Sequence, residues 1–139
     1  MTIQERFVHE LKRQGHSVTK SRQAVFAALQ RWGPIDVRRL IQSVHTTVDR
    51  ATVYRVVSLF EELGIVRRIP YGWKYKLELS DTFTDHHHHA HCVRCEKLIT
   101  LHEHKELEKA IEQTARDHGI VPNEHHLEIY GYCSSCRNE

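Results

Sequence analysis

The charged residues of this chain are distributed unevenly, and this distribution constrains the fold more than any single motif. Residues 1–77 carry fourteen Lys and Arg against six Asp and Glu, a net charge of +8, whereas residues 78–139 carry six against twelve, a net charge of −6. Ten of the thirteen His and all four Cys also lie in the second part. A chain of 139 residues can form one domain or two very small ones. We therefore expect two small domains with different roles, 1–79 and 80–139, which excludes a large single-core enzyme.

The apolar segments of the chain are short. None reaches the length that crosses a membrane. Residues 1–14 alternate apolar with charged side chains, unlike a secretory signal. We therefore expect a cytoplasmic protein without a membrane partner, in a reducing compartment where structural disulfides are rare.

The first part of the chain has the pattern of four helices followed by a hairpin. Apolar residues recur at helical spacing between Ile3 and Leu11, and three later helices have expected N-caps at Thr19, Asp36 and Asp49. Gly64 is expected to end the fourth helix. Residues 65–79 then read as two strands around a Pro/Gly turn. This order predicts a winged helix-turn-helix.

The helix predicted after Asp49 has two different faces. Its inner face is expected to contain Val53, Val56, Val57 and Phe60. Ala51, Tyr54 and Arg55 lie on the outer face and, with Arg22, are the predicted DNA-contacting residues. A slim helix end with donors for base edges suits the major groove. These could instead be ordinary solvated residues, but the net charge, the helix order and the basic hairpin favour DNA binding.

Two C-x-x-C pairs indicate a structural metal site. Four thiolates satisfy tetrahedral zinc, so the sequence predicts a Zn²⁺ site formed by Cys92, Cys95, Cys133 and Cys136. Redox dithiols or disulfides are the alternatives. They are less favoured in a reducing compartment, and a thioredoxin-like motif would use a single pair.

Four consecutive histidines, His86 to His89, indicate a second kind of metal site. If they lie on a strand, alternate imidazoles face opposite sides of the sheet, so one strand can serve two sites. Each site would need ligands from elsewhere, and Glu78, Glu108 and His125 are candidates. A solvated polyhistidine loop without metal is the alternative.

Five segments of the chain carry a resemblance to a known family. They are VTKSRQAVFAAL (18–29), DRATVYRVVSLFEELGIV (49–66), LELSD (77–81), HHHHAHCVRC (86–95) and HHLEIYGYCSSC (125–136). The chain resembles the ferric uptake regulator (Fur) family of bacterial metal-responsive repressors. The resemblance implies an α+β fold: an N-terminal winged helix-turn-helix domain, then a small α/β dimerisation domain with a structural zinc site.

The resemblance also implies a function and its residues. A homodimer would bind an A/T-rich palindromic operator when a regulatory Fe²⁺, Zn²⁺ or Mn²⁺ is loaded, controlling iron or zinc homeostasis without enzymatic activity. The four cysteines match the structural zinc site, and Tyr54 and Arg55 match DNA-contacting positions. The site within the dimerisation domain would contain His86, His88, Glu108 and His125. The regulatory site would contain Glu78, His87 and His89.

The chain departs from the family pattern at three places. Many relatives contribute a His just before the third helix, where this chain has Gly33–Asp36. Many place a carboxylate after the second cysteine, where this chain has Glu96–Thr100. We therefore expect His102, or its neighbour Glu103, to complete the regulatory site. Ser17 stands where relatives often have a Lys or Arg.

Three other functions are compatible with parts of this pattern. A peroxide-sensing regulator of the same family is one alternative. A metal storage or delivery protein that does not bind DNA is another, but it would not require the winged helix. A metal-dependent hydrolase is disfavoured because the chain lacks an H-E-x-x-H motif.

Overall fold

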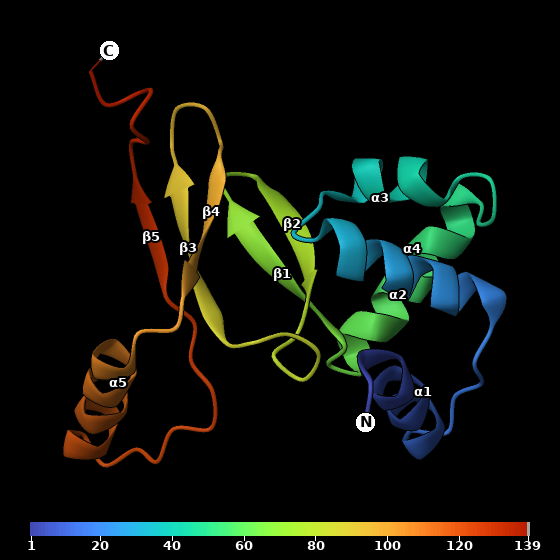
Figure 1. Cartoon of the computed structure of the whole chain (residues 1–139), viewed down its shortest axis with the longest axis horizontal. Helices are drawn as coiled ribbons and strands as arrows, with labels where there is room; N and C mark the ends of the chain where they lie inside the picture. Colours follow the sequence, from blue (N-terminus) through green and yellow to red (C-terminus); the bar gives the residue numbers. More distant parts are fainter. Residues whose placement is uncertain (139) are drawn as a thin grey trace. The chain divides into compact units, whose positions relative to one another are not determined.

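The computed structural model describes residues 1–138. The first four helices are α1 (Ile3–Arg13), α2 (Lys20–Trp32), α3 (Val37–Val44) and α4 (Arg50–Glu62). An antiparallel hairpin follows, formed by β1 (Val66–Tyr71) and β2 (Lys74–Leu79). The remaining elements are β3 (His87–Cys92), β4 (Leu98–His102), α5 (Lys105–Asp117) and β5 (Glu128–Gly131) (Figure 1). The predicted α+β class is confirmed.

The chain divides into two compact units, Met1–Asp85 and His86–Glu139. The loop after β2 belongs to the first unit, although the sequence suggested a boundary after residue 79. Phe83 explains this, because it is 2% exposed and its ring meets the edge of Phe26 at a centroid distance of 5.3 Å. Burial of an aromatic ring in the helical core holds the loop to the first unit.

The helices of the first unit start where short polar side chains can cap them. Asp49 accepts a hydrogen bond from the backbone N–H of Thr52 at 2.8 Å, which satisfies one of the donors exposed at the start of α4. Thr2, Thr19 and Asp36 cap the other three helices in the same way. The three predicted caps are thus confirmed, and each rests on a local interaction that the sequence reveals.

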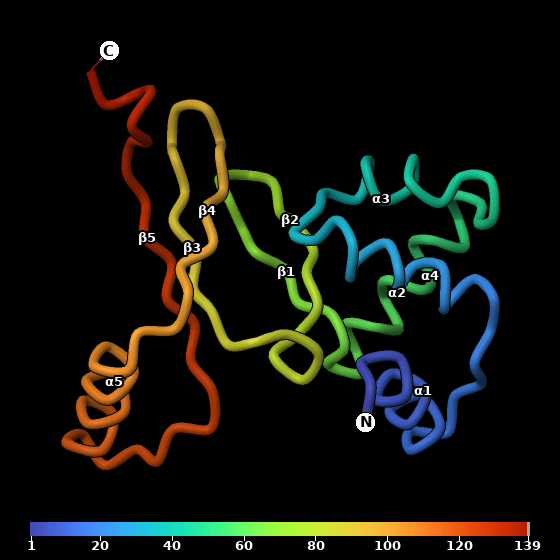
Figure 2. Tube along the Cα trace, in the orientation of Figure 1, coloured from blue at the N-terminus to red at the C-terminus, as the bar shows by residue number. Residues whose placement is uncertain are grey.

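The core of the first unit is built around three aromatic rings. Phe7 stacks on Phe26 at 4.0 Å and meets the edge of Phe60 at 5.6 Å, which joins α1, α2 and α4. Ile35, between α2 and α3, forms an isolated β-bridge with Leu77 of β2 through two backbone hydrogen bonds. The hairpin is therefore attached to the helices through the backbone. Figure 2 shows the segment between α2 and α3 passing beside β2.

The second unit contains a three-stranded sheet with β3 in its centre. β4 pairs antiparallel with one edge of β3, and β5 pairs parallel with the other. Helix α5 follows β4 along the chain. No α5 residue is buried in the chain, and Leu107 is 39% exposed. The helix therefore keeps an apolar stripe at the surface.

Among residues 1–138, every helix is too short or too polar to cross a bilayer.

Candidate metal centres and nucleic-acid interface

The four cysteines lie together in the second unit. The parallel pairing of β3 with β5 places Cys92 opposite Gly131, so the two C-x-x-C segments leave the sheet side by side. All four sulfurs lie within 4.8 Å of one another, and none forms a disulfide. Four converging sulfurs fit tetrahedral Zn²⁺. The structure therefore brings together the residues predicted for structural zinc.

The cysteine thiols differ in how readily they ionise. Hydrogen bonds from the backbone N–H groups of Cys95 and Cys133 lower the pKa of Cys92 to about 6. A hydrogen bond with the Cys133 side chain and burial raise the pKa of Cys136 to about 12. Metal binding by thiolates releases protons. Cys92 is thus the cysteine of this cluster whose thiol most readily loses its proton and becomes a metal-binding thiolate.

A second cluster gathers three imidazoles around one carboxylate. Glu108, on α5, lies 2.7 Å from Nε2 of His88, 2.6 Å from Nε2 of His125 and 3.2 Å from Nε2 of His86. The four ligand atoms all lie within 4.8 Å of one another. Burial raises the pKa of Glu108, but the hydrogen bond with His88 and the nearby imidazoles outweigh it, so this pKa lies below its usual value. The carboxylate is therefore ionised at neutral pH.

The chemistry of this cluster fits a first-row divalent metal. Three imidazole nitrogens and one carboxylate oxygen are a donor set suited to Zn²⁺, Fe²⁺ or Mn²⁺. His86 and His88 come from the start of β3, Glu108 from α5 and His125 from the segment before β5. The structure thus brings together all four residues that the resemblance assigned to the dimerisation-domain site.

His87 and His89 occupy the opposite face of β3, and their ring centroids lie 4.9 Å apart. His102 on β4 stands opposite His87 in the strand register. Side chains opposite each other in an antiparallel pair share a face. His102 is therefore a neighbour of His87, while its role as a ligand stays a prediction.

Glu78, the other predicted ligand of the regulatory site, lies on β2 in the first unit. It is 4% exposed and forms an ion pair of 2.6 Å with Arg67. Arg67, one of the cations of the basic hairpin, is thus paired with a carboxylate of the same hairpin. Arg68 is likewise paired, with Glu61 at 2.8 Å. The set of Glu78, His87 and His89 stays a prediction.

Two residues that the sequence reasoning missed lie beside this histidine face. Glu128 on β5 is 3.0 Å from Nδ1 of His89 and 2.6 Å from Nε2 of His91. The period of two that selects His87 and His89 continues to His91, so this signal was readable. The position of Glu128 was not, because it depends on the register of β5 against β3.

The outer face of α4 is the candidate nucleic-acid interface. Val53, Val56, Val57 and Phe60 are buried, as predicted. Ala51, Tyr54 and Arg55 are exposed, and the guanidinium of Arg50 lies 5.9 Å from the Tyr54 ring. Arg22 is half-buried and donates to the backbone oxygen of Ser17 at 2.6 Å. Only part of the Arg22 side chain is therefore presented to solvent.

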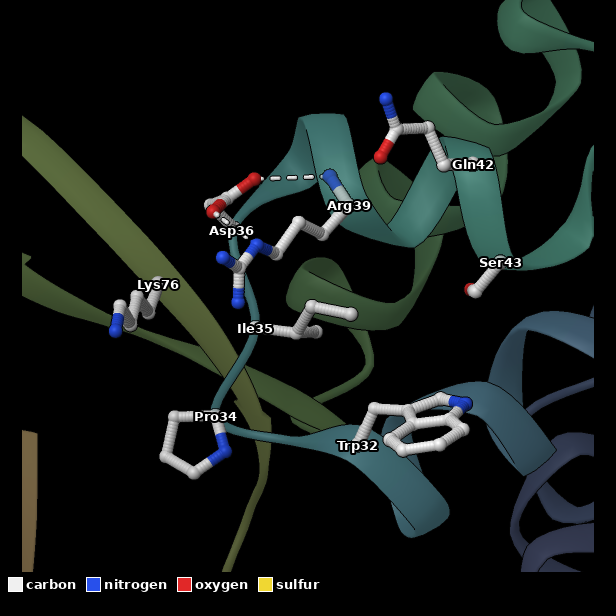
Figure 3. A pocket seen from close by; sticks show the side chains of 8 residues that line it. All are labelled: Trp32, Pro34, Ile35, Asp36, Arg39, Gln42, Ser43 and Lys76. Atoms are coloured by element: carbon white, nitrogen blue, oxygen red, sulfur yellow. Dashed lines mark hydrogen bonds and ion pairs between the residues drawn. The ribbon is translucent and has the colours of Figure 1, made fainter.

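A cavity of about 360 Å³ lies in the first unit, beside the segment between α2 and α3. Trp32, Pro34, Arg39 and Lys76 are among its lining residues (Figure 3). Its one carboxylate, Asp36, already caps α3 and accepts from the backbone N–H of Arg39. The lining contains neither His nor Cys, so the cavity lacks the donors of a transition-metal site.

A helical unit with an exposed polar helix face, joined to a unit with two converging metal-ligand clusters, defines a metal-responsive regulator. The model of the Ferric uptake regulator family matches residues 13–130, and the chain belongs to this family.

Individual relatives agree with this membership. The ferric uptake regulation protein of Yersinia pestis is 32% identical over 139 residues, covering 93% of this chain and 90% of the relative. The peroxide-responsive repressor PerR of Staphylococcus saprophyticus is 28% identical and covers 95% and 90%. The structure of the ferric uptake regulator from Pseudomonas aeruginosa with manganese has a TM-score of 0.78 and 26% identity, covering 91% of this chain and 96% of that one.

Proposed function

We propose that this protein is a transcriptional repressor that binds an A/T-rich palindromic operator as a homodimer when a regulatory Fe²⁺, Zn²⁺ or Mn²⁺ is loaded. The observation that carries the proposal is the cluster of His86, His88, Glu108 and His125, a convergent metal donor set in a chain of this family. The exposed face of α4 supports DNA reading. Such a repressor acts on chromosomal DNA, which places it in the cytoplasm.

The metal sites would have different roles. The four cysteines would hold structural Zn²⁺ and keep β3 and β5 together. Glu78, His87 and His89, with His102 or Glu103, would form the regulatory site, whose bound ion supplies the positive charge that keeps imidazoles and carboxylate together. Because Glu78 lies in the domain that carries α4, coordination of Glu78 at the regulatory site would limit the orientations that this domain can adopt. A preference of a few kcal/mol for the DNA-competent orientation is enough to switch occupancy strongly.

The homodimer is supported by apolar surface on the second unit. Leu107 of α5 and Ile129 and Tyr130 of β5 are all at least 39% exposed. Exposed apolar groups of this kind mark interaction surfaces. A two-fold dimer would present two α4 helices to successive major grooves, about 34 Å apart.

A gel-shift titration tests this function. The zinc-loaded protein should bind an A/T-rich palindromic duplex more tightly with Mn²⁺ than with chelator. Arg55→Ala should weaken binding by about tenfold or more, since one base-contacting arginine contributes about 1–3 kcal/mol. Arg116→Ala, on the surface of α5, is the matched control. Affinity independent of metal would exclude the switch, and metal binding without DNA binding would favour a storage or delivery protein.

A peroxide-responsive repressor is the second candidate, and the relative of that name from Staphylococcus saprophyticus supports it. Iron at the regulatory site could direct oxidation of a ligating histidine. Treatment of the Fe²⁺-loaded protein with hydrogen peroxide should then add an oxygen atom to His87 or His89 and release DNA. Mass spectrometry of the peptide spanning β3 would detect it, with the Mn²⁺-loaded protein as control.

A further inference from the structure

The carboxylate of Glu128 lies between two imidazoles of β3. Its Oε1 is 3.0 Å from Nδ1 of His89, and its Oε2 is 2.6 Å from Nε2 of His91. Both imidazoles are almost completely buried, at 1% and 6% exposed. Neither Glu128 nor His91 belongs to the predicted ligand sets, so this pair of contacts has no role in the function proposed above.

The register of the sheet produces this arrangement. Glu128 stands opposite His89 in the parallel pairing of β5 with β3, and Tyr130 stands opposite His91. The Tyr130 ring stacks on the His91 ring at 4.7 Å and 13°, which holds the second imidazole against the sheet. Glu128 is thus fixed at both oxygens, by two rings that are themselves restrained.

The direction of the two hydrogen bonds determines where each imidazole carries its proton. An ionised carboxylate only accepts hydrogen bonds, so His89 must donate from Nδ1. A neutral imidazole has one N–H, and a proton on Nδ1 leaves the lone pair on Nε2. Nε2 of His89 is then the nitrogen in the correct state to bind a metal ion.

We propose that Glu128 is a positioning residue that fixes the tautomer and the ring orientation of His89 for metal binding. His91 acts through Glu128, because it holds the second oxygen and prevents the carboxylate from rotating away. This inference rests on the proposed regulatory site at His89. Carboxylates that orient a metal-binding His typically contribute 10- to 100-fold in metal affinity.

The tautomer can be measured on the metal-free protein by long-range ¹H–¹⁵N NMR of ¹⁵N-histidine-labelled samples. The wild type should show a His89 ring protonated at Nδ1, and Glu128→Ala should convert it to a mixture of both tautomers. Glu128→Gln keeps an oxygen that can accept from Nδ1, so it should largely preserve the wild-type tautomer. Glu112→Ala removes an equal charge from the exposed surface of α5 and should change nothing.

Metal affinity provides the second measurement. Mn²⁺ is titrated into zinc-loaded protein carrying Glu108→Ala, so that the cluster around Glu108 does not contribute. Adding Glu128→Ala should weaken the remaining site 10- to 100-fold, and Glu128→Gln should restore most of this loss. His91→Ala should have a smaller effect, since it leaves the hydrogen bond to His89.

Two results would overturn the inference: a His89 tautomer that is the same in wild type and Glu128→Ala, or an altered tautomer with unchanged Mn²⁺ affinity. If Glu128→Ala fails to fold, Glu128→Leu takes its place, because Leu fills a similar volume and has no atom that accepts a hydrogen bond from Nδ1 of His89. Failure of the proposed function is a separate outcome. A wild-type protein that binds Mn²⁺ but no DNA would contradict the repressor and leave the role of Glu128 intact.

Discussion

Asp49 illustrates how one residue links an acid–base equilibrium to the helix that is proposed to read DNA. Hydrogen bonds from the side chain and the backbone N–H of Thr52 lower the pKa of Asp49 below its ordinary value. A carboxyl whose pKa is lowered by folding stabilises the fold when ionised. This stabilisation is present above the unfolded pKa of about 3.9 and is lost as the pH falls through the lower folded value.

We predict that Asp49→Asn lowers the free energy of unfolding at pH 7 and that its difference from wild type shrinks below about pH 4. Asn can still cap a helix, so the change isolates the charge. Urea unfolding at several pH values measures it. Glu62→Gln, near the end of the same helix, is the control and should not destabilise the protein. A difference that grows on acidification would contradict the prediction.

At the scale of elements, the hairpin of β1 and β2 distributes its positive charge unequally. Arg67 and Arg68 are engaged with carboxylates of the first unit. Lys74 is exposed at the start of β2, next to Trp73, whose side chain is fully exposed. The exposure of its side chain makes Lys74 a candidate for a phosphate contact beside the DNA groove.

We predict that Lys74→Ala reduces the salt dependence of operator binding. Each phosphate contact contributes about 0.9 to the slope of log affinity against log salt concentration, so the slope should fall by about this amount. Fluorescence anisotropy with labelled operator at several salt concentrations measures it. Lys109→Ala on α5 removes a cation from the other unit and should leave the slope unchanged. An unchanged slope in Lys74→Ala would show that Lys74 does not contact a DNA phosphate.

The elements differ in how far the sequence predicts them. α3 and α4 are readable because Asp36 and Asp49 cap them by contacts three residues away. β4 was not predicted, because its strand conformation depends on pairing with β3 across a turn. The Glu108 cluster followed from the family resemblance and strand alternation, whereas the contacts of Glu128 depend on a parallel register that no local signal reports.

At the scale of the whole molecule, the two units have different sources of stability. The first has its own aromatic and aliphatic core, including Phe7, Phe26 and Phe60. Among the described residues of the second unit, His89 is the one large side chain that is less than 2% exposed. A small unit with few buried apolar residues needs cross-links or metals to fold. We therefore expect the second unit to depend on zinc.

We predict that Cys136→Ser, or zinc removal by a chelator, unfolds the second unit and leaves the first folded, because structural zinc binding contributes directly to folding. Hydrogen exchange should show lost protection in β3, β4, α5 and β5, while the helices of the first unit keep theirs. Both tryptophans lie in the first unit, so their emission should not change. Ser134→Ala, at a position between Cys133 and Cys136, is the control. Simultaneous loss of protection in α2 and α4 would contradict independent units.

The position of Cys92 at the end of β3 has a consequence for how this strand tolerates insertions and deletions. A slip of one residue turns every side chain of a strand to the other face. Positions 86 to 89 are all His, so a slipped strand would still offer imidazoles on both sides, and the histidines alone do not distinguish the two alignments. Cys92 does, because the slip would carry its sulfur away from the other three. The cysteine cluster thus fixes the register of β3. Deletion of one residue from β3 should therefore destabilise the second unit more than any single replacement within the strand.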